Sequence, residues 1–169
     1  MTMIHIMSKE STSTLTAVQP QDIQPNAVDL RLGKVFQIND ENDFTIDEEQ
    51  MIHKGSTPVP LWEDGYWYLY GGAYEVIMEN EVEVGHDECG FVITRSTLNR
   101  NGVFLTSGLY DSGYKGVMAG VMHIAGNQLT KTRIKQGTRI GQFLCFKAEA
   151  LSSYDGDYGR GKEHDKKYS

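Results

Sequence analysis

Two arginines and two hydroxyl side chains fall within six residues near the middle of the chain, in the segment Arg95-Ser96-Thr97-Leu98-Asn99-Arg100. Arginine is the side chain best suited to bidentate contact with phosphate. A turn-forming segment at residues 108–116 follows, and it carries a single carboxylate, Asp111. An aspartate beside such a cluster could activate a water against a bound phosphate. The two segments together predict a site that binds and hydrolyses a phosphate compound.

Charge is divided unevenly along the chain, whose formal net charge is −7. Residues 39–88 contain fourteen acids and one base, whereas residues 89–147 contain eight bases and one acid, Asp111. The net negative charge argues against general nucleic-acid binding. The basic part could hold a polyanion the size of a triphosphate, or the two parts could be complementary faces of one oligomer. Both interpretations stay open, because salt screens such fields within about 10 Å.

The size and composition indicate one domain with a real core, because the chain has 169 residues. Its eighteen glycines and many β-branched and aromatic residues favour strands and turns. No apolar run approaches the roughly 20 residues that span a bilayer, and the N-terminus lacks the features of a signal peptide. We expect no membrane partner and a cytoplasmic location, which is the host cytoplasm if the chain is viral.

The two cysteines, Cys89 and Cys145, lie in apolar segments that resemble strands. We expect both to be reduced core residues rather than a disulfide or a metal pair. No cluster of histidine and cysteine has the spacing of a zinc site. The absence of zinc-site spacing argues against a zinc-type nucleobase deaminase.

Short apolar and aromatic segments separated by glycine turns predict an all-β sandwich or barrel. Residues 39–64 are acidic, contain two prolines, and are expected to form a long loop with at most one short strand. No amphipathic helix of three turns is predicted. The expected strands are at residues 29–38, 66–70, 74–78, 90–94, 103–105, 117–124, 130–134 and 139–147.

The chain is predicted to contain three parts. Residues 1–20 are polar and form a flexible N-terminal segment, residues 21–150 form the β domain, and residues 151–169 form a flexible C-terminal flap. The last part holds three tyrosines and four bases among glycines. It is either a solvated tail or a flap that orders over a nucleotide, with tyrosine on the base and basic side chains on phosphates.

Four segments, at residues 24–33, 95–102, 108–116 and 137–143, resemble motifs of the dCTP deaminase/dUTPase superfamily in order and spacing. The first has the form typical of the dCTP deaminase branch. The second resembles the phosphate-binding motif, and the third resembles the hairpin motif that carries the water-activating aspartate of dUTPases. The resemblance covers residues 24–146, which is most of the chain. It implies a distorted β-jelly-roll of the dUTPase type that assembles as a homotrimer with active sites between subunits.

The resemblance also implies roles for particular residues, and a deoxynucleoside triphosphate as the substrate. Asp29 and Arg100 would position the substrate-binding side chains without contacting the substrate themselves. The residues that would bind the substrate phosphates are Arg95, Ser96, Thr97, Gln142, Arg160 and Lys162. Those that would bind base and sugar are Thr106, Ser107, Gly108, Leu109, Tyr114 and Tyr158.

The reaction implied by the resemblance is Mg²⁺-dependent hydrolysis of dUTP to dUMP and pyrophosphate. Asp111 would be the catalytic residue and would polarise a water for in-line attack on the α-phosphorus. Mg²⁺ would bridge phosphate oxygens without direct protein ligands, which fits the lack of a carboxylate cluster near the motifs.

Two departures from the family pattern leave alternatives open. dCTP deaminases carry a catalytic glutamate five residues after the glycine that closes the hairpin motif, and this chain has Val121 there. A dCTP deaminase would need a relocated proton shuttle, for example Glu88 or a residue of the tail. The segment between Gly102 and Asp111 is also about two residues shorter than in either branch. This shortening motivates a third hypothesis, a nucleotide-binding or regulatory protein without efficient catalysis.

Overall fold

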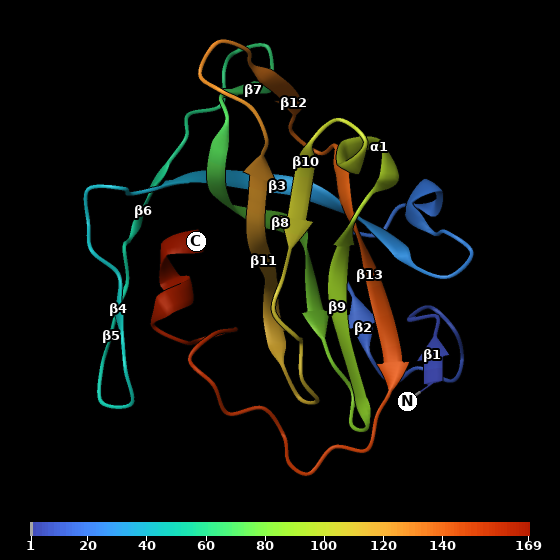
Figure 1. The fold of residues 1–169 in the computed structure, drawn as a ribbon. Helices are drawn as coiled ribbons and strands as arrows, with labels where there is room; N and C mark the ends of the chain where they lie inside the picture. Colours follow the sequence, from blue (N-terminus) through green and yellow to red (C-terminus); the bar gives the residue numbers. More distant parts are fainter. Residues whose placement is uncertain (1) are drawn as a thin grey trace.

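The computed structural model describes residues 2–169, and strands make up most of its ordered elements (Figure 1). Three short helices accompany them, η1 (Pro20–Asp22), α1 (Ser96–Asn99) and η2 (His164–Tyr168). The strands are β1 (Thr2–Ile4), β2 (Thr14–Leu15), β3 (Val28–Ile38), β4 (Thr45–Ile46), β5 (Met51–Ile52), β6 (Ser56–Pro58), β7 (Tyr66–Leu69), β8 (Gly72–Glu83), β9 (Glu88–Thr94), β10 (Val103–Thr106), β11 (Lys115–Ile124), β12 (Thr132–Lys135) and β13 (Arg139–Lys147).

The long strand β3 joins two halves of a curled sheet. Its first residues pair with β13, and its later residues pair with β8. The partner changes between Arg31 and Leu32, and the pairing with β8 then shifts register between Leu32 and Lys34. A Cβ atom on Gly33, between them, would lie 3.1 Å from the backbone of β8. The glycine therefore lets β3 pass close to β8 as it moves from one half to the other.

The two halves enclose one core. In the first half β13 lies between β9 on one side and β3 with β1 on the other. In the second half the order is β6-β3-β8-β11-β10. The apolar side chains that point between the halves include Leu30, Leu32, Val76, Met118, Met122, Ile140 and Phe143, all of which are buried. This architecture confirms the predicted all-β, jelly-roll type of fold.

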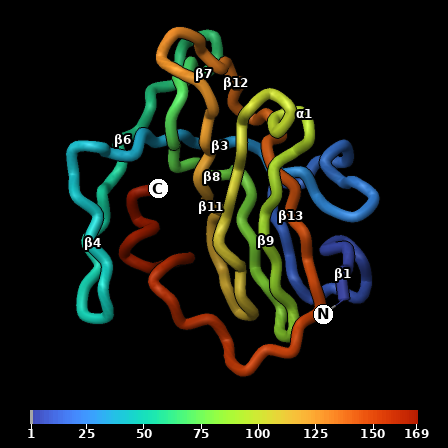
Figure 2. Tube along the Cα trace, in the orientation of Figure 1, coloured from blue at the N-terminus to red at the C-terminus, as the bar shows by residue number. Residues whose placement is uncertain are grey.

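Two regions differ from the predicted elements. The glutamate-rich link expected after residue 78 continues β8 to Glu83, because the glutamates at 79, 81 and 83 alternate with buried Asn80 and Val82. Residues 39–64 contain three short strands instead of at most one. Two of them, β4 and β5, form a hairpin that projects away from the main sheet (Figures 1 and 2). Short polar segments with few buried side chains give a weak strand pattern.

The N-terminal segment is attached to the sheet through Glu88. This buried carboxylate accepts hydrogen bonds from the backbone or side chains of residues 11–13 and from Lys147 Nζ at 2.6 Å. Burial raises the pKa of Glu88, but the hydrogen bonds, first that of Lys147, outweigh burial and hold the pKa at about 2. Glu88 therefore anchors residues 11–13, and the flexibility predicted for residues 1–20 stays a prediction.

The C-terminal segment runs along one end of the sheet and returns upward beside β11 (Figure 2). Its last helix, η2, lies between β11 and the β4–β5 hairpin, and Tyr168 is buried against Phe36 of β3. The flexibility predicted for this flap also stays a prediction. In residues 2–169 no helix has the length and apolar character needed to cross a membrane.

Candidate functional site

A buried carboxylate, Asp29 on β3, organises the first part of the site. Its side chain has no solvent exposure. Arg95 Nε forms an ion pair with it at 3.2 Å, and Arg139 Nη1 donates a hydrogen bond to it at 3.2 Å. Gln142 Nε2 donates to its other oxygen at 3.1 Å, and Gln24 Nε2 donates at 3.2 Å. We call these five residues the Asp29 cluster. Side chains from three separate segments, at Gln24, at Arg95 and in β13, therefore converge on one carboxylate.

The two guanidinium groups of the Asp29 cluster keep free donors toward solvent. Arg95 also donates to the carbonyl of Arg139, and Arg139 donates to the carbonyl of Gln21. Each guanidinium has five N–H donors, so these contacts leave at least three on each. The side chains of Arg95 and Arg139 are 27% and 31% exposed. The cluster can thus offer two oriented cations to an anion, with one carboxylate fixing their positions.

Arg139 was missed as a site residue at the level of sequence because a regular strand places residues 139 and 142 on opposite faces. In the structure the pairing of β13 with β3 shifts register between Arg139 and Gly141. This irregularity brings both Arg139 and Gln142 onto Asp29. No local pattern in the sequence marks such a shift.

The other residues predicted to contact phosphate lie in two places. Ser96 and Thr97 are exposed in α1, directly after Arg95, and Arg100 is exposed at the end of the same helix. The remaining two belong to the C-terminal tail and lie with carboxylates of the same chain. Arg160 bonds Glu81 and Glu83 of β8 at 2.8 and 2.9 Å, and Lys162 lies 3.6 Å from Asp155.

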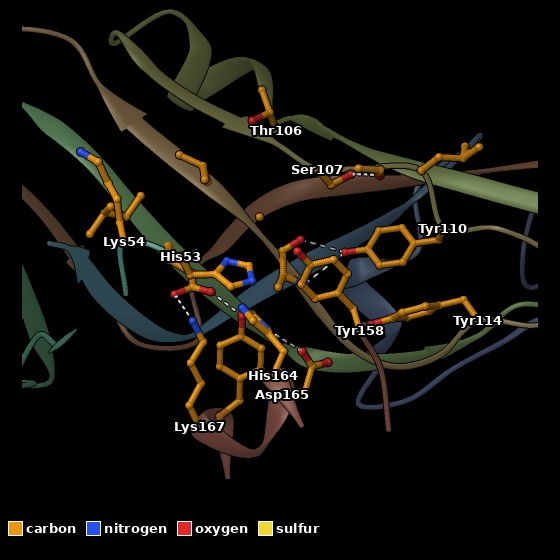
Figure 3. Close-up of a pocket in the computed structure, with 18 of the residues that line it drawn as sticks. His53, Lys54, Thr106, Ser107, Tyr110, Tyr114, Tyr158, His164, Asp165 and Lys167 are labelled. Atoms are coloured by element: carbon orange, nitrogen blue, oxygen red, sulfur yellow. Dashed lines mark hydrogen bonds and ion pairs between the residues drawn. The ribbon is translucent and has the colours of Figure 1, made fainter. Parts of the chain in front are cut away.

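A cavity of about 710 Å³ forms the second part of the site (Figure 3). It lies between the outer face of β8, β10 and β11, the segment after β10, and the C-terminal tail. Tyr158, His164 and Lys167 of the tail lie below Ser107 and Thr106 in this view. The cavity brings together all the residues predicted for base and sugar: Thr106, Ser107, Gly108, Leu109, Tyr114 and Tyr158. We call it the hairpin cavity.

The wall of the hairpin cavity is held by hydrogen bonds of the hairpin itself. Ser107 Oγ accepts from the backbone of Val92 and donates to the carbonyl of Gly108. The buried Tyr110 hydroxyl bonds both backbone groups of Ala119, and the Tyr114 hydroxyl donates to Val117. Burial raises the pKa of both tyrosines. They therefore act as neutral donors that fix the cavity wall.

One glycine permits the close approach of β10 and β11 at the cavity floor. A Cβ atom on Gly120 would lie 2.3 Å from the carbonyl oxygen of Thr106. Real Cβ atoms do not come so close to a backbone oxygen. Any larger residue at position 120 would push these strands apart where Thr106 and Val121 pair.

Asp111 lies at the far end of β9 from Arg95. It is exposed and directly follows Tyr110, whose backbone pairs with Gly90 near the start of β9. Burial and then the charge of Asp111 raise the pKa of Cys89, in agreement with this position. Five residues of extended chain separate Gly90 from Arg95, so roughly 16 Å of strand lies between the two ends. Asp111 and the Asp29 cluster of one chain therefore do not meet.

Glu75 of β8 was not predicted as a site residue, yet it lies in the hairpin cavity. It accepts from Ser56 Oγ at 2.5 Å, from Lys167 Nζ at 2.9 Å and from the Tyr168 hydroxyl. Burial raises the pKa of Glu75, but these hydrogen bonds outweigh burial and lower it, so the side chain is ionised. Glu88, in contrast, is not among the residues that line the cavity, and it bonds Lys147.

The chain is similar to known proteins over most of its length. Residues 2–148 match the family described as dCTP deaminase-like. A probable deoxyuridine 5'-triphosphate nucleotidohydrolase of Aeropyrum pernix is 31% identical over 138 residues, covering 80% of this chain and 84% of the relative. The probable enzyme of the same name in Methanopyrus kandleri is 30% identical over 141 residues, covering 81% and 87%.

Solved structures share the fold at low sequence identity. The 2'-deoxycytidine 5'-triphosphate deaminase of Agrobacterium tumefaciens superposes with a TM-score of 0.57 at 17% identity, covering 79% of this chain and 43% of the deaminase. A mutant dUTPase from phage phi11 of S. aureus, with a coordinated structural Mg(II) ion, gives a TM-score of 0.51 at 10% identity, covering 89% and 99%. With the match over residues 2–148, this chain belongs to the dCTP deaminase-like family.

Proposed function

We propose that this protein hydrolyses dUTP to dUMP and pyrophosphate with Mg²⁺. The observation that carries the proposal is the Asp29 cluster, in which one buried carboxylate holds Arg95 and Arg139 together. Two oriented guanidiniums match the charge and geometry of a phosphate chain. The names of the relatives from Aeropyrum pernix and Methanopyrus kandleri supply dUTP as the substrate.

The nucleoside occupies the hairpin cavity in this proposal. Its backbone wall at residues 106–109 offers donors and acceptors to a base edge, and Tyr114 and Tyr158 offer ring surfaces. The volume of about 710 Å³ lies in the range of small-molecule pockets. All six residues that were predicted for base and sugar line this single cavity, which supports their assignment.

Asp111 acts as the general base. It takes a proton from a water as the water oxygen attacks the α-phosphorus in line with the bridging oxygen to the β-phosphorus. That bond breaks, and pyrophosphate leaves with the displaced oxygen. Asp111 follows Tyr110, which lines the hairpin cavity, so it lies within one residue of the nucleoside site.

The phosphate-binding residues supply charge neutralisation and positioning. Arg95, Arg139 and Gln142 contact phosphate oxygens, and Ser96 and Thr97 of α1 add hydroxyl donors beside Arg95. Asp29 acts behind them, because it orients both guanidiniums while it stays buried. Arg160 and Lys162 reach the phosphates when the tail leaves its contacts with Glu81, Glu83 and Asp155.

The residues present fit Mg²⁺ held by the substrate rather than by a protein cage. Within residues 2–169 no three histidine, cysteine or carboxylate side chains converge on a possible metal position. Mg²⁺ usually keeps several waters and binds through substrate phosphates with few carboxylates. When bound there, Mg²⁺ would neutralise phosphate charge.

A complete site needs two copies of the chain. Asp111 and the Asp29 cluster lie at opposite ends of β9 in one chain, and roughly 16 Å of strand separates them. In the proposed homotrimer, the hairpin cavity of one subunit faces the Asp29 cluster of the next.

The proposal is tested by incubating the purified protein with Mg²⁺ and each of dUTP, dCTP, dTTP, dATP and dGTP. Pyrophosphate and ammonia are measured separately. We expect pyrophosphate from dUTP at the highest kcat/KM and no ammonia. Nucleotide binding without pyrophosphate release would contradict hydrolysis, and ammonia from dCTP would indicate a deaminase.

A variant assigns the chemistry to Asp111. Asp111→Asn is expected to lower kcat on the order of 10²- to 10⁴-fold, because it removes a positioned base, while dUpNHpp binding stays close to that of the unaltered protein. Asp43→Asn, an exposed aspartate of the acidic segment, serves as the control. Equal turnover by both variants would remove Asp111 from its role.

A further inference from the structure

We propose that Glu75 is the base-reading side chain of the hairpin cavity, and that its carboxylate accepts a hydrogen bond from an N–H donor on the pairing edge of a pyrimidine. The inference rests on the proposed function in one respect, which is that the nucleoside occupies this cavity. It adds a specificity-determining residue that the sequence motifs do not contain.

The first observation is the register of three strands at the cavity floor. Thr106 on β10 pairs with Val121 on β11, and Val121 pairs with Glu75 on β8. Residues in one such row point to the same face of a sheet and lie about 5 Å apart. All three line the hairpin cavity. The row therefore presents a hydroxyl, an apolar surface and a carboxylate side by side.

The second observation is the character of Val121. Its side chain is 36% exposed and forms an apolar part of the cavity floor. A pyrimidine ring can lie on such a surface, because its faces are apolar and its edges carry the polar groups. A ring placed on Val121 brings its edge within reach of the neighbouring Glu75 carboxylate.

The third observation is the state of the Glu75 carboxylate. A carboxylate has about four lone-pair sites, and three donors occupy sites here: Ser56, Lys167 and Tyr168. Ser56 and Lys167 bond Oε2, whereas Tyr168 bonds Oε1. One lone pair of Oε1 therefore remains. The three donors come from β6 and η2, so they fix the side chain before a ligand arrives, which lowers the entropic cost of binding.

The chemistry of an ionised carboxylate decides what it can recognise. It accepts hydrogen bonds and cannot donate them, so its ligand must present an N–H. Uracil offers its ring N3–H, and cytosine offers its 4-amino group. The other carboxylate of the cavity, Asp165, already accepts from Gly159 N at 2.7 Å and contacts His164 Nδ1 at 3.1 Å. Glu75 is the carboxylate that stands in the strand row beside Val121, so it is the acceptor next to the apolar floor on which the ring lies.

The test measures binding without turnover, by calorimetry with dUMP, dCMP and N3-methyl-dUMP, which lacks the ring N–H. For the unaltered protein we expect N3-methyl-dUMP to bind roughly 10- to 100-fold more weakly than dUMP, the usual effect of a lost hydrogen bond to a charged group. The Glu75→Gln substitution should lower the affinity for dUMP by a similar factor. The variant should then bind dUMP and N3-methyl-dUMP almost equally. If cytosine is the base that is recognised, Glu75→Gln lowers the affinity for dCMP instead.

Two controls separate base reading from support of the tail. Glu79→Gln changes an exposed glutamate of the same strand and should leave every affinity unaltered. Tyr168→Phe removes a donor to Glu75 but keeps its carboxylate, so it should preserve the preference for dUMP over N3-methyl-dUMP. Equal binding by Glu75→Gln and the unaltered protein would overturn the inference, as would a Tyr168→Phe variant that reproduces the loss. Binding with these preferences but without pyrophosphate release would refute the hydrolase and leave base reading in place.

Discussion

Replacing Asp29 with asparagine should lower the free energy of unfolding and weaken phosphate binding. The substitution keeps the shape of the side chain but removes a buried charge that contacts Arg95 and Arg139 at 3.2 Å. Breaking a buried ion pair costs about 3–5 kcal/mol. Both guanidiniums are roughly a third exposed and can be rehydrated, so we expect a loss of about 2–3 kcal/mol in unfolding free energy.

The assay for Asp29→Asn combines denaturant unfolding with calorimetry. Affinity for dUpNHpp should fall by roughly 10-fold or more, because two guanidiniums lose their fixed orientation, whereas affinity for dUMP should change little. Asp22→Asn is the matched control, since Asp22 is also buried and bonds Arg31 at 2.6 Å. It should destabilise the fold and leave the ratio of the two affinities unaltered. A normal ratio in Asp29→Asn would refute the role given to the Asp29 cluster.

Two further predictions concern stability. Gly120→Ala should lower the unfolding free energy by about 1–3 kcal/mol through overpacking and should weaken dUMP binding, because the new Cβ would lie 2.3 Å from the Thr106 carbonyl oxygen. A variant that unfolds thermally at the same temperature as the unaltered protein would contradict this. The pKa of Glu88, lowered from 4.5 to about 2, contributes stability that is present above pH 4.5 and is lost as the pH falls toward 2. This contribution is about 3 kcal/mol, and Glu88→Gln should flatten the unfolding free energy between these pH values, whereas an unchanged slope would contradict it.

Sequence alone was enough to predict elements and site residues that belong to a continuous local segment. The strand at residues 139–147 was predicted with the bounds of β13, because a mainly apolar segment follows the turn at Gln136-Gly137. Five of the residues predicted for base and sugar come from the hairpin motif that carries the family resemblance, and they follow closely along the chain from Thr106 to Leu109 with Tyr114. A continuous segment keeps its members together however the rest of the chain folds.

Sequence alone did not predict the site residues whose contacts depend on the register between distant strands. Arg139 reaches Asp29 because the pairing of β13 with β3 is irregular. Glu75 enters the cavity because it pairs with Val121, 46 positions further along the chain. A shift of one residue in either pairing would turn the side chain to the other face. Such registers are set by packing of the whole sheet, which no short motif encodes.

The central claim is that Asp111 of one copy and Arg95 of another act on the same substrate. It is tested most directly by mixing two inactive variants, Asp111→Asn and Arg95→Ala, unfolding and refolding them together, and measuring pyrophosphate release from dUTP. Mixed oligomers would contain some sites with both native residues, so we predict that activity returns to a substantial fraction of that of the unaltered protein. Mixed oligomers without any recovered activity would contradict a site shared between subunits.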